Sequence, residues 1–125
     1  MKWSLQQLSR YTKTPLEFSG VTRYDEYALT SDIIRIDEVK YHGTCLALSD
    51  DYFRFDIHIE TVLYLEDART LEDVAYPINL DVTEYFGKDP DDEESRFVEK
   101  NTVDLYDVIW ENILLEKPMY IIKTK

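Results

Sequence analysis

One short segment contains three side chains that could hold a metal ion. Asp56, His58 and Glu60 stand two residues apart within YFRFDIHIETVLYL, residues 52–65. Imidazole and carboxylate groups are ligands for divalent transition metals, so one hypothesis is a small metal-dependent enzyme. The polar face of an amphipathic strand places polar side chains at the same spacing. We favour the strand and expect no metal and no cofactor.

Two other groups of residues have types that suggest chemistry. His42 and Cys45 lie three apart, so an extended strand points them to opposite faces, and we interpret Cys45 as a small buried apolar residue. The acidic run from Asp89 to Glu94 resembles a calcium loop only superficially, since an EF-hand needs glycine where Glu94 stands. Three glycines and no phosphate-binding motif leave no small-molecule substrate evident.

Charge narrows the classes of partner. Twenty-six acidic against fourteen basic residues leave a net charge of −12, and Lys and Arg form no run of three. Nucleic acid binding depends on clustered basic residues, so the chain is not expected to coat RNA phosphates. A direct RNA-binding module would need Arg23, Arg35, Arg54 and Arg69 to converge. An acidic surface favours basic protein partners and repels anionic membranes.

Length and composition indicate a single domain spanning residues 1–125. The single cysteine excludes an internal disulfide and suits a reducing compartment. No apolar run approaches the roughly 18 residues of a membrane span, and the first residues lack the apolar run of a signal peptide. We therefore expect a cytoplasmic protein.

The first half of the chain predicts one helix and two strands. Ser4 and Gln7 form a capping box, with Trp3 and Leu8 as a hydrophobic staple, and the helix should run to about Tyr11. The strand at 16–23 should bend or bulge at Gly20, and that at 38–48 should bulge at Gly43, where the apolar parity changes. Residues 24–36 fit either a helical turn or a loop, and residues 49–51 predict a turn.

The second half predicts two long strands and a helix. Residues 52–65 and 74–86 alternate apolar and polar side chains, and Pro77 indicates an edge or a strand start. Residues 87–101 predict a solvated, mobile acidic loop. Asp104 should cap a helix that ends before Pro118, and residues 119–123 suggest a last strand. The fold class is α+β: an antiparallel sheet or partly closed barrel of five to six strands with two flanking helices.

Residues 62–86, VLYLEDARTLEDVAYPINLDVTEYF, resemble the central signature of the YceD family, the large ribosomal RNA subunit accumulation proteins. The matching positions are Arg69, Thr70, Leu71, Glu72, Asp73, Tyr76, Pro77, Glu84 and Phe86. The opening MKWSLQQL resembles Gram-positive members. DLYDVIWENILLEKP resembles a further family element through Asp104, Leu105, Glu111, Ile113, Leu114, Leu115 and Pro118.

The chain departs from the family pattern at two points. The family cysteine before the arginine is Asp67 here, and the second cysteine of some members is Thr70, so a zinc or redox role does not transfer. The chain also stops soon after Pro118, where many members continue with a polar tail. It resembles a Gram-positive-type member with a shortened C-terminus, or one that is cut short.

The resemblance implies a non-enzymatic role in large ribosomal subunit biogenesis, through accumulation of large-subunit rRNA. Family genes often neighbour one for a small ribosomal protein of that subunit. Combined with the charge of −12, this implies an acidic adaptor for a basic ribosomal protein or a precursor particle, with indirect rRNA contact.

The expected partner-binding residues are Arg69, Thr70, Glu72, Asp73, Trp110 and Glu111. Arg69 has two interpretations. Its guanidinium either forks onto Glu66, Glu72 or Asp73 and holds the connection between strands, which we favour, or projects as a contact to RNA or a partner carboxylate. For Trp110 we favour core packing over exposure on the helix.

Overall fold

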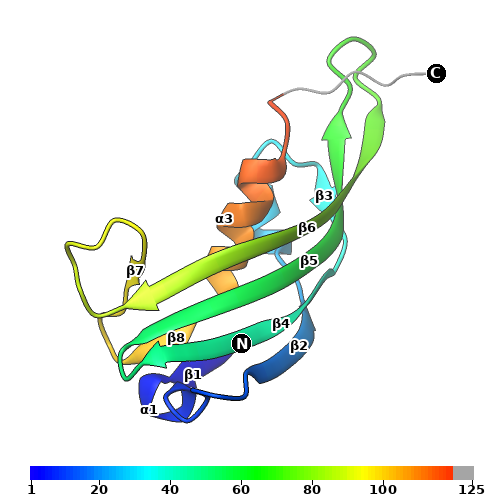
Figure 1. Cartoon of the computed structure of the whole chain (residues 1–125). Helices are drawn as coiled ribbons and strands as arrows, with labels where there is room; N and C mark the ends of the chain where they lie inside the picture. The colour runs from blue at the N-terminus through cyan, green and yellow to red at the C-terminus, as the bar shows by residue number, and fades with distance from the viewer. Residues whose placement is uncertain (120–125) are drawn as a thin grey trace.

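The computed structural model describes residues 1–119, which form eight strands and three helices (Figure 1). In chain order the elements are β1 (Lys2–Ser4), α1 (Leu5–Leu8), β2 (Leu16–Thr22), α2 (Asp25–Leu29), β3 (Arg35–Ile36), β4 (Val39–Ser49), β5 (Tyr52–Glu66), β6 (Asp73–Gly87), β7 (Arg96–Phe97), β8 (Thr102–Asp104) and α3 (Tyr106–Glu116). The expected strand at 119–123 lies outside the described residues except for Met119.

The main sheet has the strand order β2-β4-β5-β6-β7, and β3 also pairs with β5. Its pairs are antiparallel except β6–β7, which is parallel. The long β5–β6 hairpin keeps one register from Tyr52 opposite Gly87 to Glu66 opposite Asp73. The α+β class is confirmed, and the predicted antiparallel arrangement holds for every pair of this sheet except β6–β7. The sheet is not a closed barrel, and three helices are present instead of two.

One face of the sheet is buried and the other is open. The odd-numbered residues of β5 are buried, including Phe53, Phe55, Ile57 and Ile59. In Figure 1 α3 lies behind the sheet, and the face towards the viewer carries no helix. The buried stripe of α3 contains Val108, Ile109, Trp110 and Ile113, as the helical spacing predicts. The side chains on the open face are the even-numbered residues of β4 and β5.

The N-terminal segment is tied to the start of α3. Ser4 and Gln7 form the expected capping box, at 2.9 and 3.1 Å, but α1 ends at Leu8 and does not reach Tyr11. β1 and β8 form a second, two-stranded sheet in which Trp3 pairs with Val103. This pairing joins residues a hundred positions apart, so local sequence patterns carry no signal for it.

The bulges expected at Gly20 and Gly43 are wrong. β4 keeps Val39, Tyr41, Cys45 and Ala47 on its buried face, and its register breaks only between Ala47 and Ser49. A Cβ at Gly43 would collide with the backbone carbonyl of Asp56, and one at Gly20 would collide with the Tyr41 ring. Gly43 therefore needs glycine because a neighbouring backbone approaches closely, and Gly20 leaves room for the Tyr41 ring, without an extra residue in either strand.

The acidic loop is more structured than its composition suggests. Phe97 of β7 pairs with Gly87, and Val98 is buried. Lys88 Nζ donates to the Val98 carbonyl at 3.1 Å and to Asn101 Oδ1 at 2.9 Å. Whether the acidic stretch between these anchors is mobile stays a prediction.

Candidate functional site

The β5–β6 turn is built by a buried carboxylate. Asp67 has no exposed surface, and its Oδ1 accepts hydrogen bonds from the backbone N–H groups of Arg69 at 2.7 Å and Thr70 at 2.9 Å. The Asp67 backbone closes the turn by bonding to Glu72 and to Leu71 at 2.7 and 2.9 Å. Leu71 has a φ of 63°, in the left-handed region. An aspartate turn thus replaces the missing glycine and asparagine.

The favoured role of Arg69 is wrong. The Arg69 side chain takes part in none of the ion pairs within residues 1–119, so it does not fork onto Glu66, Glu72 or Asp73. Arg69 is exposed at the hairpin tip, together with Thr70, Glu72 and Asp73. These four expected partner-binding residues do lie in one place, and a contact through them stays a prediction.

The other two expected site residues lie elsewhere. Trp110 is 8% exposed and stacks on Tyr24, with 5.3 Å between ring centroids, as core packing predicts. A ring so buried offers little surface to a partner. Glu111 is exposed on α3 and pairs with Arg96, which lies in register with Phe86. Phe86 is thirteen residues from Asp73 along β6, which is roughly 43 Å of strand. The six residues do not form one site.

Arg96 is the centre of a polar cluster that sequence reasoning missed. Its Nε and Nη2 donate to the two oxygens of Glu84 at 2.9 and 3.4 Å, and its Nη1 contacts Glu111 Oε2 at 2.6 Å. Asn112 Nδ2 donates to the same Glu84 carboxylate at 2.9 Å. Burial acts to lower the pKa of Arg96, but Glu84 and Glu111 outweigh it and raise the pKa overall. The cluster fastens β7 and the acidic loop to β6 and α3.

The candidate metal ligands contact neighbouring side chains on the open face of the sheet. Asp56 accepts from Thr83 at 2.7 Å and pairs with Arg54 at 3.1 Å. His58 lies between two carboxylates, with Nδ1 2.7 Å from Asp81 and Nε2 3.4 Å from Glu60.

The hydrogen bond to Asp81 is the main reason why the His58 pKa is raised, and Glu60 adds to it. No group of three or more His, Cys, Asp or Glu residues in the described part of the chain is arranged to hold a metal ion.

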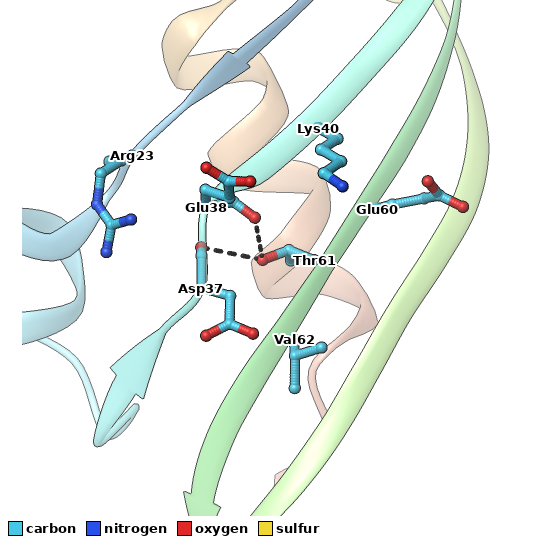
Figure 2. Close-up of a pocket in the computed structure, with 7 residues that line it drawn as sticks. All are labelled: Arg23, Asp37, Glu38, Lys40, Glu60, Thr61 and Val62. Carbon is cyan, nitrogen blue, oxygen red and sulfur yellow. Dashed lines mark hydrogen bonds between the residues drawn. The ribbon is translucent and has the colours of Figure 1, made fainter.

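A pocket of about 460 Å³ opens where β3 leads into β4 (Figure 2). Arg23 lies on one side and Lys40 and Glu60 on the other, and the Thr61 hydroxyl donates to the backbone carbonyls of Asp37 and Glu38. Arg23 is paired with Asp25 at 2.7 Å, which raises the Arg23 pKa. The lining mixes both signs of charge and contains no nucleophile beside a base. It is lined by Arg23, Asp37, Glu38, Lys40, Glu60, Thr61 and Val62.

The remaining chemical candidates are separated by the fold. Cys45 is fully buried, which raises the pKa of its thiol to about 12, and His42 is exposed on the opposite face. Among the arginines, Arg54 and Arg69 lie near opposite ends of the β5–β6 hairpin, and Arg35 stacks on the Tyr64 ring at 3.5 Å. The four arginines proposed for RNA binding therefore do not converge.

Comparison with known proteins places these residues in a family. Residues 55–125 match the family described as "Large ribosomal RNA subunit accumulation protein YceD". The chain is 35% identical to "Uncharacterized protein YlbN" of Bacillus subtilis (strain 168), over 97% of this chain and 73% of that protein. The chain belongs to the YceD family. No solved structure matches it.

In this YceD member, the matched region begins within β5 and includes the hairpin tip, the acidic loop and α3. Glu84 and Glu111, two residues through which the sequence resembles the family, both contact Arg96 and so lie close together in the fold. The family description names an accumulation factor and no reaction. No helix among residues 1–119 has the length and apolarity to cross a membrane.

Proposed function

We propose that this YceD member supports accumulation of large-subunit rRNA in the cytoplasm as a non-enzymatic acidic adaptor. It holds a basic ribosomal protein, or docks on a precursor particle through such a protein, and contacts rRNA indirectly. The observation that carries the proposal is the net charge of −12 on a member of a family described by rRNA accumulation. Electrostatic attraction then speeds encounter with a cationic partner.

The distribution of the arginines supports a protein partner over bare RNA. Arg23 and Arg54 pair with neighbouring carboxylates, and Arg35 covers the Tyr64 ring. Binding to phosphates requires several basic groups on one surface, because each released counterion contributes to affinity. A basic protein needs only exposed carboxylates, which this chain has in excess.

The proposal is tested by depletion and by affinity capture. Depletion of the protein should lower large-subunit rRNA relative to small-subunit rRNA. Tagged protein should retain a basic large-subunit protein at about 0.05 M salt and lose much of it at about 0.5 M, since salt screens charge attraction. Unchanged rRNA ratios, or tight binding of a protein-free rRNA fragment at physiological salt, would contradict the proposal.

A further inference from the structure

One end of the sheet concentrates carboxylates from two connections. The β4–β5 turn and the β6–β7 connection lie at this end because Tyr52 pairs with Gly87 (Figure 1, left). We call this surface the acidic end. Its carboxylates are those of Asp50, Asp51, Asp89, Asp91, Asp92, Glu93 and Glu94.

Two basic residues of the same connection are engaged by other groups, although Lys88 also lines a hollow with Asp50 and Asp51. Lys88 bonds to Val98 and Asn101, and Arg96 bonds to Glu84 and Glu111. Two of the three basic side chains in residues 87–101 are therefore engaged with the body of the fold. Arg96 is neutralised by carboxylates outside the acidic end, so it offsets none of the seven charges named above.

Aromatic rings lie beside the carboxylates. The Tyr52 ring stacks on Tyr85, with centroids 5.8 Å apart and 16° between planes, and it covers Gly87. The Ser95 hydroxyl lies beside the same point at Gly87 as the Tyr52 ring, and it donates to Asp92 Oδ2 at 2.9 Å, which places the Asp92 carboxylate near the ring. Phe97, next to Gly87 in register, is 46% exposed.

We propose that the acidic end binds an arginine-rich segment of the protein partner, an inference that rests on the proposed function. A guanidinium group is planar, so it can pair with a carboxylate and stack on an aromatic face at once. The acidic end offers both chemistries, with the Asp92 carboxylate held by Ser95 near the Tyr52 ring and Glu94 exposed two residues further on. A lysine ammonium can use the carboxylates but not the planar stacking.

The carboxylates are tested with defined peptides. Fluorescent nona-arginine and nona-lysine are titrated with the full chain at about 0.1 M salt. The variant D91N/E93Q/E94Q keeps Asp92, which accepts hydrogen bonds from the Glu94 N–H and the Ser95 hydroxyl. It should weaken nona-arginine binding by about tenfold.

The matched control, E17Q/E26Q/E116Q, removes three exposed charges on β2, α2 and α3. It should weaken binding by less than about twofold, because exposed charges beyond a Debye length are screened.

The aromatic contribution is tested separately. The wild-type chain should bind nona-arginine several-fold more tightly than nona-lysine, and Y85T should remove most of that difference while changing nona-lysine binding little. Circular dichroism and thermal melts should show that the variants are folded. Equal binding of both peptides by the wild-type chain would contradict the role of the rings.

Two outcomes separate this inference from the proposed function. If both triple variants weaken binding equally, binding follows overall charge and the acidic end is not the site, while the adaptor proposal stands. If the peptides bind at the acidic end but depletion leaves rRNA ratios unchanged, the proposed function fails. The acidic end then remains a binding site for arginine-rich peptides. If polyuridylate binds the wild-type chain and displaces nona-arginine from it, the choice of a protein partner is overturned.

Discussion

At the β5–β6 turn, Asp67 is a fully buried carboxylate in a stretch of exposed charges. It satisfies the N–H groups of Arg69 and Thr70, and Leu71 adopts a left-handed conformation beyond them. A buried donor without its acceptor costs about 1–3 kcal/mol. We therefore expect D67A to lower the free energy of unfolding in urea by about 2 kcal/mol. R69A, its control, should change that free energy by less than about 0.5 kcal/mol; a larger loss for R69A would restore the structural role of the arginine.

The signature that residues 62–86 resemble has a cysteine where Asp67 stands, whereas the turn here is held by an acceptor of backbone hydrogen bonds. D67C, which introduces the family residue, should remove most of that stabilisation because a thiol is a weak acceptor. The measurement is again urea unfolding. A D67C chain as stable as the wild type would mean that the cysteine satisfies the turn equally well.

His58 makes a pH-dependent contribution to stability. Its pKa is raised above 6.5 in the folded state by Asp81 and Glu60, with His42 and Lys40 as the cationic or ionisable neighbours on β4. A raised folded pKa means that the stabilisation is fully present below about pH 6.5 and is lost as pH rises through the folded value. The stability difference between wild type and H58Q should therefore be largest near pH 5.5–6 and fade towards pH 8.5.

The control for His58 is D81N, which removes its main partner. In the D81N background, H58Q should produce a much flatter pH dependence of the unfolding free energy. A wild-type advantage that grows with rising pH would reverse the sign and contradict the assignment.

At the scale of elements, β7 and the acidic loop depend on Arg96. It joins Glu84 of β6 to Glu111 of α3, and the Glu84 side chain is 17% exposed. In R96A the Glu84 carboxylate keeps only its hydrogen bond from Asn112. We therefore expect the free energy of unfolding to fall by about 1–2 kcal/mol, a loss limited by the partial exposure of the Arg96–Glu84 pair. Hydrogen exchange should speed up in residues 88–98 and stay unchanged at the hairpin tip. R96K keeps the charge without the fork and should give an intermediate result.

The elements that the sequence predicts are those whose pattern lies within one short stretch of the chain. The alternation in β5 and the helical stripe of α3 are local patterns imposed by one buried face, and both are confirmed. β1, β7 and β8 are two or three residues long and exist through distant pairing, so periodicity carries no trace of them. A bulge was expected at Gly43 because the apolar parity changes there, but Cys45 and Ala47 keep the buried parity and the apolar Leu46 and Leu48 lie on the open face.

The candidate site was predicted less well than the fold, for a related reason. Asp67 is one acid in an acidic stretch. Its position two residues before Arg69 and three before Thr70, whose backbone N–H groups it binds, is the only signal that could have marked it. The acidic end combines two turns whose proximity depends on the register of β5 with β6. Composition gives the net charge of the chain, whereas the location of that charge required the fold.

For the whole molecule, self-repulsion should dominate the response of stability to salt. The described residues form seven ion pairs, two of which share His58, against a net charge of −12. Exposed ion pairs contribute little, while a large net charge destabilises the compact state. Raising NaCl from about 0.05 to 0.5 M shortens the Debye length and should raise the melting temperature by several degrees. KCl should act alike, because the effect is screening; a fall in melting temperature would show that the ion pairs around Arg96 and His58 outweigh repulsion.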